Sequence, residues 1–167
     1  MTDGNRASKD GRAAEGMVAN LLNSRGYSEI EQDSRERKLL NKFIKEGGDP
    51  LTCLSELGGN KVFVRQCVGY PTIYGKPARH DFLVQGGESL TDGLIIEVKW
   101  QSVGGSVDEK YPFVAASFKA LSQMTCLVLD GGGATDKAIE WVKAQEDKRF
   151  LVFRGIGSFI NWMRKHG

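Results

Sequence analysis

The chain lacks the patterns that define membrane, secreted and zinc-binding proteins. No run approaches the roughly 18 to 20 consecutive apolar residues of a membrane span, and the polar start, Met1 to Gly11, has no apolar signal segment. The three cysteines, Cys53, Cys67 and Cys126, lie among apolar residues at spacings that match no zinc site. We therefore expect a cytoplasmic protein without a membrane segment, whose cysteines are reduced thiols in the core.

An excess of charge of one sign is also missing. The 23 Lys and Arg residues nearly balance the 21 Asp and Glu residues, so the formal net charge of +2 permits nucleic-acid binding without demanding it. The densest basic stretch runs from Arg35 to Lys45 and is interrupted by Glu36. A solvated helix face and a DNA contact surface both explain that stretch, and the alternatives stay open.

Several common catalytic patterns are absent as well. The sequence has no Ser/His/Asp order and no histidine pair of the H-N-H type. The glycines at 131–133 precede Lys137, but they lack the spacing of a phosphate-binding loop. We interpret them as a turn between a strand and a helix, which argues against a small-molecule nucleotide enzyme.

Hydrophobic periodicity predicts one α/β domain over residues 1–167, large enough to bury its own core. Helices are expected at about 9–25, 35–45, 113–124 and 135–145, with a C-terminal helix capped by Ser158, and strands at 61–68, 80–84, 94–100, 125–129 and 150–153. Residues 70–79 are expected to form a loop, and the residues at about 27–60 a helical insertion. This order predicts an antiparallel three-strand meander within a mixed central sheet flanked by helices.

The most informative residues lie on the strand at 94–100. Side chains alternate faces along a strand, so Glu97, Lys99 and Gln101 share one face. Asp81, on the neighbouring strand of a hairpin, would place its carboxylate beside that of Glu97. Two carboxylates are the hard oxygen ligands that Mg²⁺ takes alongside water, and Lys99 would stand next to the metal.

This arrangement supplies what phosphodiester hydrolysis needs. A metal lowers the pKa of the attacking water and neutralises charge on the phosphate, and an ammonium group orients or deprotonates the water. By itself, Glu97-x-Lys99 is also an ordinary pattern of a half-exposed strand. The apolar run before Glu97, the upstream Asp81 and a helix carrying Glu15 favour the catalytic interpretation.

These residues resemble the PD-(D/E)XK nuclease superfamily through Asp81 and Glu97-Val98-Lys99, although His80 replaces the proline of the family name. The segment from Glu97 to Pro112 looks like a stretch of some restriction-endonuclease-like and phage-encoded members. The first helix, Arg12 to Gly26, is similar to that of archaeal-type Holliday junction resolvases, in which a glutamate joins the metal site.

The resemblance implies a restriction-endonuclease-like core and a metal site of Asp81, Glu97 and Glu15. The cofactor would be Mg²⁺, with Mn²⁺ as a substitute, and the substrate DNA. Gln101 would act near the scissile phosphate or the attacking water. DNA contacts are assigned to Lys110, Ser106 and Arg79, whereas His80 is interpreted as structural or DNA-facing and not as a ligand.

Three functions follow, in order of preference. The first is a Mg²⁺-dependent DNA endonuclease, acting as a homodimer because two strands need two single-site subunits. The second is a structure-specific Holliday junction resolvase or repair nuclease of the same superfamily. The third is a non-catalytic DNA-binding module, which the intact Asp81, Glu97 and Lys99 argue against.

Overall fold

Helices and strands alternate along most of the chain, and the computed structural model describes residues 3–102 and 108–167, with side chains from residue 11 onward. The helices are α1 (Asp3–Ser24), α2 (Arg35–Lys45), α3 (Pro50–Gly58), the 3-10 helix η1 (Asp108–Lys110), α4 (Tyr111–Lys119), α5 (Asp136–Lys143) and α6 (Ile156–His166). The strands are β1 (Ser28–Glu29), β2 (Lys61–Pro71), β3 (Pro77–Gly86), β4 (Leu94–Trp100), β5 (Met124–Asp130) and β6 (Phe150–Arg154).

The strands form one mixed sheet in which their spatial order equals their order in the sequence, from β1 to β6. Strands β2, β3 and β4 are antiparallel neighbours, which confirms the predicted meander. Strands β4, β5 and β6 run parallel, and β1 runs parallel to β2. Parallel strands need crossover connections, and α4 and α5 provide them.

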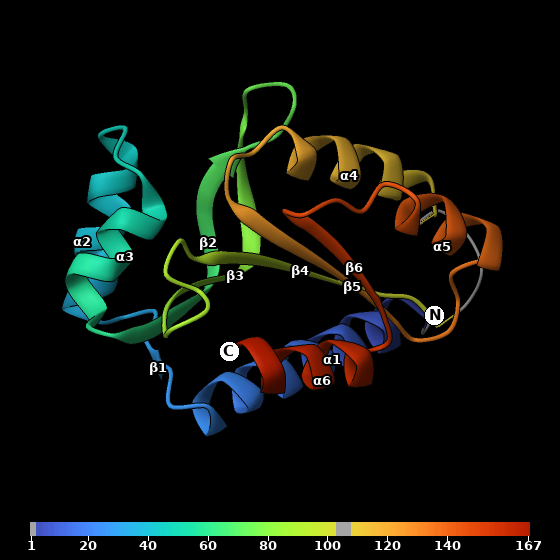
Figure 1. Cartoon of the computed structure of the whole chain (residues 1–167), viewed down its shortest axis with the longest axis horizontal. Helices are drawn as coiled ribbons and strands as arrows, with labels where there is room; N and C mark the ends of the chain where they lie inside the picture. Colours follow the sequence, from blue (N-terminus) through green and yellow to red (C-terminus); the bar gives the residue numbers. More distant parts are fainter. Residues whose placement is uncertain (1–2, 103–107) are drawn as a thin grey trace.

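Helices cover both faces of the sheet. Figure 1 shows α1 and α6 side by side on one face and α4 and α5 on the other, with α2 and α3 beside β2. Alternation along β3 serves both layers, since Phe82 packs with Val18 of α1 and Phe159 of α6, whereas Leu83 packs in the cluster that contains Phe118 of α4. The expected α/β architecture with a mixed sheet flanked by helices is confirmed.

Each helix of the pair α2–α3 begins with a side-chain cap. Ser34 begins α2 by accepting a hydrogen bond from the main chain of Arg37, and Asp49 begins α3 by accepting one from Thr52 at 2.8 Å. The Tyr70 hydroxyl donates to the same Asp49 carboxylate at 2.7 Å, which ties α3 to β2. The sequence predicted α2 with its bounds but not α3, because Asp49-Pro50 can end one helix as well as cap and begin the next.

The prediction of a loop at 70–79 is wrong. Strand β2 continues to Pro71 and β3 begins at Pro77, and these two residues still face each other across the ladder. Only residues 72–76 turn, closed by hydrogen bonds between Thr72 and Lys76 and between Gly75 and Thr72. The prolines tolerate this place because they lie at the turn end of the hairpin, where the ladder stops and a missing N–H removes little pairing.

The boundaries of α1, which begins at Asp3, and of α4 and α6 also differ from the prediction. Helix α4 begins with Pro112 in its first turn and ends at Lys119, so Met124 belongs to β5. Helix α6 starts at Ile156 behind Gly155, which has a φ of 80°. Ser158 is therefore not its cap but lies inside its first turn, where the hydroxyl donates to the carbonyls of Arg154 and Gly155, each at 2.8 Å.

Cys53, Cys67 and Cys126 are free thiols buried in the core, as expected. Within the described parts of the chain, no helix is long and apolar enough to cross a membrane.

Candidate functional site

Regular pairing between β3 and β4 gives way to side-chain contacts at two acidic residues. The ladder places Phe82 opposite Ile96, and the next residue, Asp81, uses its carboxylate to accept a hydrogen bond from the Val98 main chain at 2.7 Å. Glu97 directly precedes Val98 on β4. The structure thus brings Asp81 and Glu97 together between neighbouring strands.

Lys99 lies on the same face of β4 as Glu97, two residues further along. Its Nζ donates directly to Glu97 Oε1. Both side chains are partly shielded from solvent, with 14% of the Glu97 side chain and 26% of the Lys99 side chain exposed. The ammonium group and the carboxylate therefore form a close pair that still has access to solvent.

Glu15 reaches this region from α1, and a residue that the sequence did not single out connects it. The Gln66 Nε2 donates to Glu15 Oε2 and to Asp81 Oδ1, each at 3.0 Å. A signal for Gln66 existed, since the adjacent polar pair Arg65-Gln66 interrupts the apolar alternation of β2. That signal indicates an irregularity in the strand, but not which residue it serves.

The electrostatics of the cluster disfavour its negative charges. Burial raises the pKa of Glu97 against the opposing effect of Lys99, and the nearby Asp81 raises it further. Burial also raises the pKa of Glu15, again with a contribution from Asp81, while the hydrogen bond from Gln66 acts in the opposite direction. A bound cation would relieve both effects.

The donor chemistry of Asp81, Glu97 and Glu15 fits a hard divalent cation such as Mg²⁺, which prefers carboxylate oxygens. Within residues 11–102 and 108–167, no three His, Cys, Asp or Glu side chains already stand as a set of metal ligands. Instead, Gln66 bonds to Glu15 and Asp81, and Lys99 bonds to Glu97. The acids are thus adjacent, each held by a nitrogen donor.

The other predicted residues lie at different distances from this cluster. Gln101 follows β4, is buried, and is tied by its main chain to Asp130 and to the turn at 131–133. Arg79 is exposed on β3, and Lys110 is exposed at the end of η1. Ser106 lies outside the described residues. His80 is 3% exposed, and its ring packs between Tyr70 and Phe118 with Nε2 3.1 Å from the Tyr70 carbonyl, so its role is structural.

Two cavities adjoin the cluster. A cavity of about 800 Å³ between α2 and the β2–β3 hairpin is lined by Gln66, Arg37, Lys45 and Arg79, among others. A smaller one, of about 70 Å³, is lined by Glu97, Arg79 and His80 together with apolar residues of α4. Arg79 therefore borders both cavities, and the larger one carries more basic than acidic side chains.

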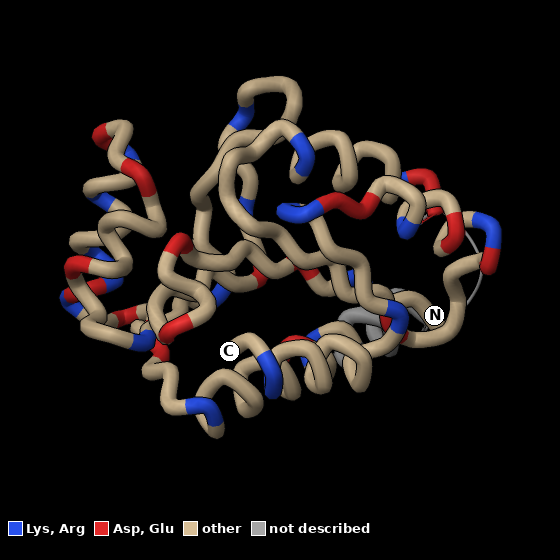
Figure 2. Tube along the Cα trace, in the orientation of Figure 1, with Lys and Arg blue, Asp and Glu red and all other residues tan. Residues whose placement is uncertain are grey.

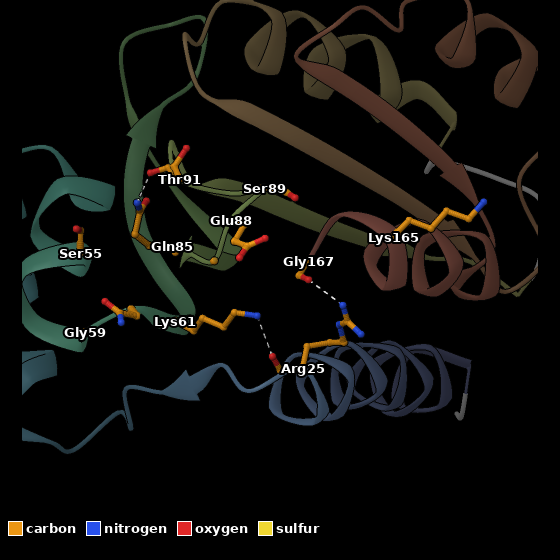
Figure 3. A pocket seen from close by; sticks show the side chains of 13 residues that line it. Arg25, Ser55, Gly59, Lys61, Gln85, Glu88, Ser89, Thr91, Lys165 and Gly167 are labelled. Carbon is orange, nitrogen blue, oxygen red and sulfur yellow. Dashed lines mark hydrogen bonds between the residues drawn. The ribbon is translucent and has the colours of Figure 1, made fainter.

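A third cavity, also of about 800 Å³, lies elsewhere (Figure 3). It sits near Arg25, which is ten residues and about 15 Å beyond Glu15 along α1. Two of its basic side chains already donate hydrogen bonds, Arg25 to the Gly167 carbonyl at 2.9 Å and Lys61 to the Arg25 carbonyl at 3.2 Å. The third, Lys165, points away from Lys61 and Arg25 (Figure 3). We assign this cavity no part in the site.

Comparison with known proteins gives one match. A family model described as a PD-(D/E)XK nuclease superfamily domain covers residues 6–166. No curated protein and no solved structure matches the chain.

Proposed function

The chain belongs to the PD-(D/E)XK nuclease superfamily, and from this premise we propose that it is a Mg²⁺-dependent DNA endonuclease that uses Asp81, Glu97 and Lys99. Its α/β fold is accordingly a restriction-endonuclease-like one. The observation that carries the proposal is the cluster itself, in which the Asp81 carboxylate accepts a hydrogen bond from Val98, next to Glu97 on the neighbouring strand, while Lys99 contacts Glu97. We further propose that residues 1–167 form one nuclease domain in which residues 27–60 are a helical insertion.

Each residue of the cluster has a distinct task in this proposal. Asp81 and Glu97, with Glu15 from α1, would hold the metal. When bound, Mg²⁺ lowers the pKa of the attacking water and offsets charge on the phosphate, and Mn²⁺ would substitute for it. Lys99 orients the water and stabilises the added negative charge, because its ammonium group lies beside Glu97. Gln101 would support the same water or the scissile phosphate.

Local charge, not net charge, supports DNA as the substrate. Lys and Arg residues are spread over the fold among acidic residues (Figure 2), so no overall field selects nucleic acid. The cavity beside Gln66, however, is lined by Lys45 and Arg79 next to the acidic cluster. We propose that Arg79 contacts a DNA phosphate there, and that Lys110 and Ser106 contribute weaker contacts.

A second candidate is a structure-specific Holliday junction resolvase or repair nuclease of the same superfamily. The place of Glu15 favours it, since this helix residue is joined through Gln66 to Asp81, and the likeness of the first helix to junction resolvases implies a glutamate in the metal site. Cleavage of a four-way junction compared with a linear duplex of the same sequence separates the two candidates.

The proposal is tested with supercoiled plasmid, Mg²⁺ and purified protein, with chelator and with Asp81→Asn as matched controls. We expect nicked or linear products with Mg²⁺ or Mn²⁺, and none with chelator or with the variant. DNA binding without cleavage under all metal conditions would instead indicate a non-catalytic DNA-binding module. Sedimentation of the same sample tests the proposed homodimer.

A further inference from the structure

Gln66 has an unusual backbone for a residue with a side chain. Its φ of 49° is the only positive value for a non-glycine residue in the described parts of the chain. On either side of it the ladder is regular, because Arg65 pairs with Phe82 and Cys67 pairs with His80. The pair between them, Gln66 and Asp81, is joined through side chains. The left-handed conformation is disfavoured by the Cβ atom, so something must hold it in place.

The irregularity changes the face of the sheet on which the following side chains lie. Val64 and Cys67, three residues apart, contribute to the same hydrophobic cluster, although a regular strand would send them to opposite faces. The partner strand does likewise, since Leu83 belongs to that cluster and His80 packs against Phe118 of the same cluster. Side-chain alternation therefore resets at Gln66, where the amide is aimed at Glu15 and Asp81.

Arg37 holds this backbone from α2. Its side chain is only 6% exposed, unlike the other basic residues of that helix. Nη1 donates to the Arg65 carbonyl at 2.9 Å and Nη2 to the Gln66 carbonyl at 3.0 Å. The guanidinium group thus donates to the carbonyl before the Gln66 nitrogen and to the carbonyl after the Gln66 α-carbon. The interpretation of 35–45 as a purely solvated or DNA-facing surface is therefore wrong for Arg37.

We propose that Gln66 is a positioning residue of the metal site and that Arg37 fixes the backbone from which it acts. The Gln66 amide donates to Glu15 Oε2 and Asp81 Oδ1, so it keeps two carboxylates of like charge adjacent before a cation arrives. The same Glu15 and Asp81 oxygens would hold a metal ion, in place of their hydrogen bonds to the amide. Without Gln66, repulsion from Asp81 would turn Glu15 toward solvent. Metal binding would then have to bring the two carboxylates together, which weakens the affinity.

This inference rests on the proposed metal site, but it is tested without cleavage. Gln66→Gly removes the amide and keeps the backbone, because glycine adopts a positive φ without strain. Gln32→Gly, at an exposed turn residue, is the matched control. Calorimetric titration with Ca²⁺ should show about tenfold weaker binding for Gln66→Gly, the lower end of losses caused by removing supporting residues of metal sites, and no change for the control.

A spectroscopic signature separates positioning from a merely structural role. The Gln66 side-chain NH₂ signal, identified by its loss in Gln66→Gly, should shift during a Ca²⁺ titration with the midpoint found by calorimetry. It should not shift in Asp81→Asn. Arg37→Met should weaken Ca²⁺ binding in the same direction, and Arg37→Lys should restore part of it, since an ammonium group can still donate to the carbonyls. Gln66→Gly decides the question even where Arg37→Met does not fold.

The outcomes distinguish this inference from the proposed function. Wild-type or tighter Ca²⁺ binding by Gln66→Gly, or a Gln66 signal that ignores Ca²⁺, overturns the inference even where the wild type cuts DNA. Ca²⁺ binding that depends on Gln66 in a protein that cuts no DNA supports the inference and contradicts the proposed function. A wild type that binds neither Ca²⁺ nor Mg²⁺ overturns both.

Discussion

The β3–β4 pair consists of two halves built on different principles. In one half, Phe82 to Val84 pair with Leu94 to Ile96, and all six side chains are fully buried. In the other half, the Asp81 carboxylate accepts a hydrogen bond from the Val98 main chain in place of a ladder pair, and Asp81 and Glu97 remain partly exposed. The first half gains stability from burial, whereas the second holds Glu97, whose pKa is raised by burial and by the nearby Asp81.

The comparison indicates that the apolar half stabilises the fold and that the polar half serves the proposed cleavage. A cluster of partly buried like charges is costly in a metal-free protein, and it persists beside an apolar half that supplies the stability. Substitutions in the polar half should therefore remove cleavage and spare the fold, while substitutions in the apolar half should do the reverse.

The largest effect is expected for Asp81→Ala. It removes a proposed metal ligand, so Mg²⁺-supported cleavage should fall by more than the roughly 10²- to 10⁴-fold that one positioned proton-transfer group supplies. The melting temperature should stay within a few degrees of wild type, because the side chain is partly exposed. Plasmid cleavage and thermal unfolding of one preparation check this, and near-wild-type cutting would remove Asp81 from the site.

Lys99→Ala should show that, within the polar half, DNA binding and the cleavage step depend on different residues. The carboxylates survive, so Ca²⁺-supported DNA binding should persist, while the single-turnover rate with Mg²⁺ should fall about 10²- to 10⁴-fold. Lys99→Arg should restore little, since its planar guanidinium places the charge differently. Should Lys99→Ala cut at the wild-type rate, Lys99 is only a strand residue.

Leu94→Ala probes the apolar half. Leu94 is fully buried opposite Val84, so its truncation should cost about 2 to 5 kcal/mol of unfolding free energy. The cleavage rate per folded molecule should stay close to wild type well below the melting temperature. Urea unfolding beside single-turnover cleavage measures both, and a rate that collapses while the protein is folded would break the proposed separation.

The smallest effect is expected at the border of the polar half, for Arg79→Ala. Loss of one phosphate contact should weaken DNA binding uniformly across sequences and lower the slope of log affinity against log salt by about 1. Ca²⁺-supported binding at several salt concentrations tests this, with Arg35→Ala on the exposed side of α2 as control. An unchanged slope would place Arg79 outside the DNA contact.

Strand alternation predicted much of the central sheet. The apolar runs gave the central strands and the meander, because buried strands leave a period that the sequence displays. The shared face of Glu97 and Lys99 follows from the same period, as does the nearness of Asp81 once a hairpin is assumed. Helix α3 was missed because Asp49-Pro50 serves equally well to end one helix and to begin another.

The Gln66–Arg37 arrangement could not be predicted. The polar pair Arg65-Gln66 indicates an irregularity in β2 but not a positive φ at the glutamine, since that conformation comes from tertiary contacts and not from residue preference. Arg37 lies in a helix rich in exposed charges, so nothing in the charge pattern distinguishes it from its neighbours. Only the packing of α2 against β2 shows that this one arginine is buried.

The most direct test of the account measures stability and activity together in Glu97→Gln, a substitution that keeps the shape and removes the charge. Because burial raises the pKa of Glu97 in the folded protein, the unfolded chain loses this proton first as pH rises. The metal-free wild type should therefore lose stability as pH rises from about 4.5, the ordinary value for a glutamate, and Glu97→Gln should lose less. The account predicts that this variant melts at or above the wild-type temperature near pH 7 without metal and has lost Mg²⁺-dependent cleavage. A variant that still cuts within tenfold of wild type would contradict the account.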